Sequence, residues 1–176
     1  MKATAPSHDS VAFLLTQIGT HAAKKFAERL ITIKLAPQHA GILRILNRSE
    51  SQSQRQLAMT LNMHASRLVA VIDELEGLGL VAREANGSDR RTYALRITEK
   101  GREAFAAIGE IAREHNQALC ASLSAEERRV LAQLLQRIAE DQGLVRGIHP
   151  GYSQLKNPGK GAVRLSDRSN AVERST

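Results

Sequence analysis

The sequence is poor in cysteine, in aromatic residues and in long apolar runs. It contains one Cys, no Trp, two Tyr and three Phe among 176 residues. One cysteine excludes an intramolecular disulfide and is ordinary for a reducing compartment. No apolar run is long enough to cross a membrane, and the N-terminal stretch lacks the apolar core of a signal peptide. We therefore expect a cytoplasmic protein that does not associate with membranes.

Motifs for catalysis and metal binding are also absent from the sequence. There is no G-x-S-x-G, no phosphate-binding loop and no glycine-rich nucleotide motif. The six histidines have no metal-ligand spacing such as H-x-x-x-H and form no cluster with Cys or paired carboxylates. We therefore expect a protein that is not an enzyme and that uses no metal and no cofactor.

Acidic residues are outnumbered, with 18 Asp and Glu against 25 Lys and Arg, a net charge of +7 and a pI near 10.1. Such a balance favours a polyanionic partner. More than half of the excess, +4, lies in residues 143–176, where Arg146, Lys156, Lys160, Arg164, Arg168 and Arg174 outnumber Asp167 and Glu173. This segment has few large apolar residues, so we expect a basic and flexible tail.

The most informative segment runs from Leu57 to Gly101, where two helical patterns precede a basic hairpin. Apolar residues recur at helical spacing in two runs: Leu57, Ala58 and Leu61, then Leu68, Val71, Ile72, Leu75 and Leu78. Asn62 suits a left-handed turn between the two helices, and Gly79 suits the end of the second. Residues 80–83 and 92–98 resemble strands, the second with Tyr93, Leu95 and Ile97 alternating, around an Asn86-Gly87-Ser88-Asp89 turn. This order of elements predicts a winged helix-turn-helix.

Helices are predicted on both sides of this segment. Their starts carry capping signals: Asp9 or Ser10, Pro37, the pair Ser53 and Gln56, and the pair Ser124 and Glu127. Gly143 suits the end of the last helix. The first and the last two helices carry more apolar surface than a small winged helix can cover. We expect a second copy of the chain to cover it, in preference to a monomer whose outer helices pack on each other.

Three segments carry a resemblance to a known family: SQRQLA (Ser53 to Ala58), HASRLVAVIDELEGLGLVAR (His64 to Arg83) and DRRTYALRITEKG (Asp89 to Gly101). They resemble the winged helix-turn-helix of MarR-type regulators, the multiple-antibiotic-resistance regulator family. The Asp-Arg-Arg tip followed by L-x-I-T-x-x-G is the most specific part. The resemblance implies a mainly α fold, an α+β winged helix flanked by N- and C-terminal dimerisation helices. The expected units are a dimerisation helix at 9–35, the DNA-binding domain at 36–100, dimerisation helices at 101–142 and the tail at 143–176.

The resemblance also implies a double-stranded DNA partner with a pseudo-palindromic operator. The expected DNA-binding residues are Ser53, Arg55, Gln56, His64, Ala65, Ser66, Arg67, Asp89, Arg90 and Arg91. Arg67 is expected to bind guanine or phosphate, Ser66 either of these, and Ala65 a thymine methyl group. The alternative for His64 is an ordinary helix cap. Ala70 stands where relatives often carry a polar or basic residue.

At the tip of the predicted hairpin, residues two apart in a strand share a side. Asp89 and Arg91 are therefore expected to pair, leaving Arg90 for the minor groove, although a bulge would exchange the two arginines. The alternative is a solvated ion pair with no role in DNA binding.

The resemblance further implies a homodimeric repressor that is released by a small aromatic or phenolic ligand. The polar residues expected to border its crevice are His21, Lys25, His39 and Arg44. We expect Cys120 to be a buried structural thiol and not a redox sensor. The alternative function is a winged-helix adaptor that binds proteins without reading DNA.

Overall fold

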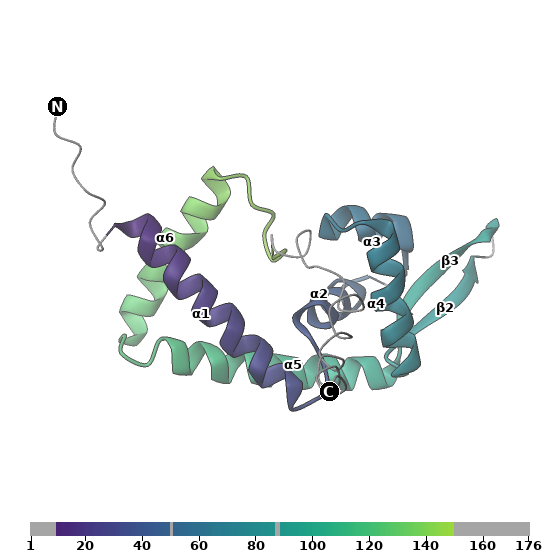
Figure 1. Ribbon diagram of the computed structural model, residues 1–176, viewed down its shortest axis with the longest axis horizontal. Coiled ribbons are helices and arrows are strands. Elements are labelled where there is room, and N and C mark those ends of the chain that lie inside the picture. Colours follow the sequence, from purple (N-terminus) through teal and green to yellow (C-terminus); the bar gives the residue numbers. More distant parts are fainter. Residues whose placement is uncertain (1–9, 50, 87–88, 150–176) are drawn as a thin grey trace, which may run out of the picture.

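The computed structural model describes residues 10–49, 51–86 and 89–149; for residues 85, 86 and 89–92 it describes the backbone. In chain order the elements are α1 (Val11–Ile31), α2 (Pro37–Leu46), β1 (Gln52–Ser53), α3 (Gln54–Leu61), α4 (Ala65–Gly77), β2 (Val81–Asn86), β3 (Asp89–Ile97), α5 (Glu99–Leu119) and α6 (Ala125–Asp141). The module made by α2, α3, α4 and the strands lies at one end of the molecule, and α6 with the start of α1 lies at the other (Figure 1). The long helix α5 joins the two ends. The expected fold class, a mainly α winged helix-turn-helix with flanking helices, is confirmed.

The three strands form an antiparallel sheet in the order β1-β3-β2. The two residues of β1 pair with Leu95 and Ala94 of β3, a third strand that the sequence did not predict. The β2–β3 ladder is irregular near its tip, because Ala85 pairs with Tyr93 whereas Asn86 pairs with Asp89. Gly87 and Ser88, in the predicted turn, lie outside the described residues.

The winged module has one apolar core, built from the positions that helical spacing predicted. Leu57 and Leu61 of α3 and Leu68, Ile72 and Leu75 of α4 are each at most 1% exposed. Two positions of these apolar patterns lie outside the core. Leu78 follows the last residue of α4 and stays 37% exposed, and Tyr93 is 54% exposed although Leu95 and Ile97, on the same strand, are buried.

The predicted capping signals start the helices where expected. Ser10, Ser53 and Ser124 each accept a backbone hydrogen bond at a helix start, and Pro37 opens α2. Asn62 has φ 48° and ψ 46°, and Gly79 has φ 71°, so both turns have the left-handed backbone that these residue types favour. The turn at Asn62 sets how α3 and α4 cross.

The helices outside the module are poorly covered by the chain itself. Of the predicted stripe on α1, Leu30 alone is buried, and none of the residues of α6, all of which the structure describes, is buried. Among the described residues, no helix combines the length and the apolar character that a bilayer crossing requires. After α6, the backbone carbonyl of Gly147 accepts a hydrogen bond from Arg44 of α2 at 3.1 Å, and Ile148 packs against the core. Residues 150–176 of the predicted tail lie outside the described residues.

Candidate nucleic-acid interface

The start of α3, the turn after it and the start of α4 surround a groove of about 840 Å³, to which β3 contributes Tyr93. The groove contains four of the sequence-predicted DNA-binding residues: Ser53, Arg55, His64 and Ala65. Ser53 is fixed by a reciprocal cap, in which its hydroxyl accepts from the Gln56 amide and the Gln56 side chain accepts from the Ser53 amide. The structure therefore brings both predicted helix starts to one surface.

The first turn of α4 holds the remaining predicted residues of that helix. His64 occupies the N-cap position, is exposed and makes no side-chain hydrogen bond to the helix, so both its predicted DNA contact and the alternative of an ordinary helix start stay open. Ser66 is exposed, whereas Arg67 is half-buried. Within the described part of the chain, the buried Nε of Arg67 has no hydrogen-bond partner. Arg67 thus packs its stem along the protein surface.

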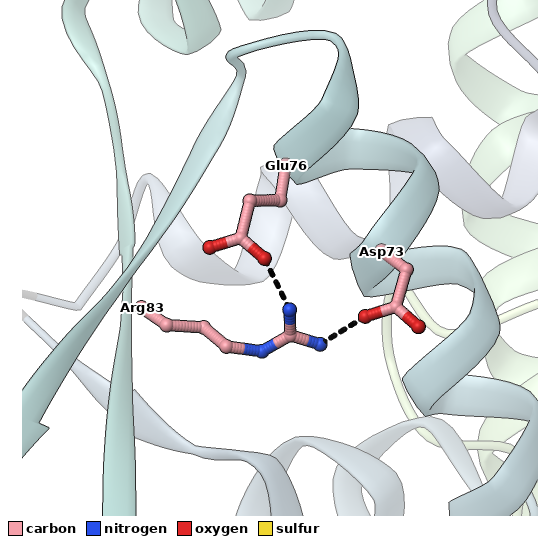
Figure 2. Close-up of polar contacts among 3 residues, drawn as sticks. All are labelled: Asp73, Glu76 and Arg83. Atoms are coloured by element: carbon pink, nitrogen blue, oxygen red, sulfur yellow. Dashed lines mark hydrogen bonds and ion pairs between the residues drawn. The ribbon is translucent and has the colours of Figure 1, made fainter.

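An ion-pair bridge joins the wing to α4 (Figure 2). Arg83 of β2 donates to Asp73 Oδ1 at 2.5 Å and to a carboxylate oxygen of Glu76, both on α4. Partial burial works to lower the pKa of the Arg83 guanidinium, but the two carboxylates outweigh it and raise that pKa above its ordinary value. Because one planar cation spans two anions on a neighbouring helix, it fixes the angle between β2 and α4.

The exit motif after β3 holds the C-terminal end of α4. Lys100 Nζ donates to the Leu78 carbonyl at 2.7 Å, and the Thr98 hydroxyl donates to the Gly79 carbonyl at 2.7 Å. The Thr98 amide donates to the Leu80 carbonyl at 3.1 Å. Three successive carbonyls are therefore satisfied by residues at the start of α5, which explains the Thr in the T-x-x-G pattern. Through this junction α4 is tied to the long helix α5.

The wing tip carries three of the predicted DNA-binding residues. Asp89, Arg90 and Arg91 lie on β3, but their side chains are outside the described residues. Their predicted sides assume regular alternation along the strand, and the ladder shifts register in this region, between Ala85 and Asn86. Their assignment stays a prediction, with the exchange of the two arginines still open.

Of the four residues predicted to border an effector crevice, two lie on α1 and two on α2. The ring of His39, 6% exposed, accepts from the Ala36 amide through Nδ1 at 3.2 Å, and its Nε2 lies 2.9 Å from Glu74 Oε2. Arg44 binds the Gly147 carbonyl. Lys25 pairs with Glu28, and His21 is exposed, both on α1. His39 and Arg44 thus already have partners within the chain.

Cys120 and the possible metal ligands are the remaining side chains with distinctive chemistry. Cys120 follows α5 and is half-buried in the single chain. Among the described residues, no group of three or more His, Cys, Asp and Glu could hold a metal ion.

Comparison with known proteins identifies the family. Residues 35–93 match the model of the MarR family. A Thauera aromatica protein named "Putative transcriptional regulatory protein for hcr operon" is 33% identical over 116 residues, which are 65% of this chain and 70% of that protein. The chain belongs to the MarR family. It is therefore a transcriptional regulator, as members of this family are.

Solved structures agree with this MarR-family assignment. A probable transcriptional regulator from Pseudomonas aeruginosa is 31% identical, with a TM-score of 0.63 over 74% of this chain and 97% of that one. The transcriptional repressor CouR, bound to a 23-mer DNA duplex, is 27% identical, with a TM-score of 0.67 over 78% and 99%. Wild-type MarR from E. coli, at 19% identity and a TM-score of 0.65 over 73% and 96%, shows the shared fold.

The groove includes residues that the sequence analysis did not predict. Met59, Val69 and Tyr93 line the groove but were left out of the predicted site. A signal existed for Val69, since it lies four residues after Ala65 and therefore on the same side of α4. The bridge from Arg83 to α4 carried no local signal, because its partners are seven and ten residues away and on another element.

Proposed function

We propose that this MarR-family regulator is a sequence-specific repressor that binds a pseudo-palindromic operator as a homodimer. The observation that carries the proposal is the open groove at the starts of α3 and α4, which is lined by Arg55, His64 and Ala65. A helix start that is exposed in this way fits the major groove of B-DNA. The CouR structure, a repressor bound to duplex DNA, supports the same role for this chain.

The roles proposed for the DNA-binding residues follow their positions. Residues at the start of α3 (Ser53, Arg55 and Gln56) contact the phosphate backbone, and residues at the start of α4 (His64, Ala65, Ser66 and Arg67) contact base edges. The wing residues Asp89, Arg90 and Arg91 serve the minor groove. In this scheme the bridge at Arg83 holds α4 and the wing at one angle, so that both contacts form together.

The dimer is proposed from the apolar side chains that α1 and α6 leave uncovered. On α1 these include Leu14 and Ile18, which are 39% and 52% exposed; on α6 they include Leu131, Leu134 and Ile138, which are 39%, 43% and 41% exposed. Full burial of such a side chain contributes about 1.5 to 3 kcal/mol, so completing the burial of each half-covered one contributes about 0.6 to 1.5 kcal/mol. A dimer that covers many of them would be obligate. Residues 9–35 and 101–142 are then the dimerisation units, 36–100 the DNA-binding domain and 143–176 a basic tail.

Release by a small aromatic or phenolic ligand completes the proposal. His21, Lys25, His39 and Arg44 remain the proposed polar border of its crevice. Because His39 and Arg44 are hydrogen-bonded within the chain, a ligand that reaches them must replace the Glu74 and Gly147 contacts. Such a ligand would act on the position of α2 and α4.

The second candidate function is a winged-helix adaptor that binds a protein partner and not DNA. A salt titration separates the two, because DNA binding through several cations weakens steeply as salt rises. We would measure fluorescence anisotropy of duplexes selected from genomic DNA between 50 and 300 mM KCl. Steep loss of specific binding supports the regulator, and no binding at 50 mM KCl supports the adaptor.

A matched pair of variants localises the interface. Arg55→Ala removes an exposed cation at the groove, and Arg113→Ala removes an exposed cation of α5 that pairs with Glu110. Both variants lose the same charge. Arg55→Ala should weaken binding and reduce the salt slope by about one, whereas Arg113→Ala should behave as wild type. Equal effects of the two would show that net charge, and not this surface, drives the binding.

A further inference from the structure

We propose that the groove between α3, α4 and β3 reads thymine methyl groups, so that apolar contacts select the operator at these positions. This inference rests on the proposed DNA binding and adds to it the chemical feature that is recognised. Three elements contribute apolar side chains to the groove: Met59 from α3, Ala65 and Val69 from α4, and Tyr93 from β3.

The exposure of these side chains shows that they form an open apolar surface. Met59 is 72% exposed, Tyr93 54% and Val69 40%. Beneath them Leu68 and Met63, 1% and 6% exposed, also line the groove and belong to the buried core. The groove is therefore a surface extension of the core, and it gains free energy from whichever apolar group covers it.

The exposed face of α4 offers few groups that could bond to a base edge. Ala65, Ser66, Val69 and Ala70 are all exposed there, and together they supply one hydroxyl group. Arg67 is half-buried, and its Nε is enclosed by protein. On the major-groove edge of B-DNA the one apolar feature is the C5 methyl group of thymine. Ala65 and Val69, which line the groove, match that methyl group, whereas the polar contacts proposed for His64, Ser66 and Arg67 lie beside it.

The border of the groove favours DNA over a neutral apolar occupant. Arg55 is exposed at one end, and His64 and the hydroxyl of Ser53 lie nearby. This combination places a cation where a phosphate would lie beside an apolar strip where a base edge would lie. A neutral small molecule or an apolar peptide would leave the cation unused.

The test removes single methyl groups from DNA and shortens one apolar side chain of the protein. Full-length protein is used to select duplexes from a random library, and each thymine of the selected half-site is then replaced by uracil. Uracil keeps every hydrogen-bonding group of thymine and lacks the methyl group alone. At one or two thymines in each half-site, the substitution should weaken binding about three- to fivefold, the value of one buried methyl group.

The matching protein variant is Val69→Ala, with Val145→Ala as its control. Val145 is 65% exposed and lies after α6, outside the groove. For Val69→Ala, the duplex with thymine and the duplex with uracil at one operator position should bind with nearly equal affinity. For Val145→Ala, the ratio of these two affinities should stay as in the wild type. Since alanine favours helix, Val69→Ala should fold, which a thermal unfolding curve checks.

Each other outcome overturns the inference. If a sequence is selected but every uracil substitution is neutral, the groove does not read thymine while the proposed DNA binding stands. If Val69→Ala weakens thymine and uracil duplexes equally, Val69 makes no contact with the methyl group, and the groove does not read thymine. If no sequence is selected, the proposed function fails as well, and an apolar ligand or peptide becomes the occupant to seek.

Discussion

Gly101 is the position where one added methyl group should do most damage. A Cβ built there would lie 2.1 Å from the Leu80 carbonyl oxygen and 2.7 Å from Ile97 Cγ1. Both neighbours are held in place, because the Leu80 carbonyl accepts from the Thr98 amide and Ile97 is 6% exposed in the core. Gly101→Ala must therefore push apart the junction that ties α4 and the wing to α5.

Three effects set the magnitude for Gly101→Ala. Overpacking of this kind costs about 1 to 3 kcal/mol. Weakening of the bond to the Leu80 carbonyl adds about 1 kcal/mol, and the better helix propensity of alanine offsets about 1 kcal/mol. The expected loss is about 2 kcal/mol in the free energy of unfolding, or roughly 4 to 8 °C in Tm for a chain of this size.

Gly109→Ala is the matched control on the same helix. A Cβ at Gly109 would meet nothing within 4 Å, so this variant should be more stable by about 0.5 to 1 kcal/mol. Urea denaturation of both variants at one fixed protein concentration measures the difference, because dimerisation would make stability depend on concentration. If the two variants shift in the same direction, the close approach at Leu80 is not what requires glycine.

Four further changes have defined outcomes. Arg83→Ala should lower the free energy of unfolding by about 1 kcal/mol and weaken DNA binding, because two carboxylates on α4 lose their shared cation. DNA affinity equal to that of the wild type would show that the bridge does not position α4. Leu134→Asp should abolish both the dimer and DNA binding although it lies on α6; light scattering that still reports a dimer would contradict this. Burial and neighbouring positive charges lower the pKa of His115 below its ordinary 6.5. The unfolded chain therefore binds this proton more readily than the folded chain, and the free energy of unfolding falls as the pH drops below about 6.5. His115→Gln should flatten that loss between about pH 7.5 and 5.5, and an unchanged profile would assign it to other groups. Arg90→Ala should reduce DNA affinity by about 1 to 3 kcal/mol with the fold intact, and unchanged affinity would mean that the wing does not reach the DNA.

Local chemistry made much of the fold predictable. Ser53 with Gln56, and Ser124 with Glu127, cap helices through atoms three residues apart, so the sequence pattern contains the whole interaction. The same holds for Asn62, whose left-handed backbone depends on its own side chain and its neighbours.

What the sequence did not reveal depends on residues far apart in the chain. The strand β1 is two residues long and exists through its pairing with β3, about forty residues later. Tyr93 keeps the regular register of Leu95 and Ile97, yet it is 54% exposed, because it borders the groove with residues of α3 and α4 that are distant in the sequence. Likewise the partners of His39 and Arg44 come from α4 and from the segment after α6.

The candidate site also contains residues that the local sequence predicts and residues that depend on tertiary packing. Residues at helix starts could be predicted from the pattern, Arg55 from the start of α3 and Ala65 from the start of α4. The apolar groove required knowledge of how α3 crosses α4 and where β3 passes, so Met59 and Val69 emerged from the structure.

The most direct test of the account is a selection of fragments from the genomic DNA of the source organism by purified full-length protein. If the protein binds its operator as a homodimer, the enriched fragments should share an inverted repeat. The half-site centres should lie about one turn of B-DNA, roughly 34 Å, apart. Binding to these fragments should weaken steeply with salt, and two chains should bind each fragment. Absence of any enriched sequence, or binding to an unrepeated site by a single chain, would contradict it.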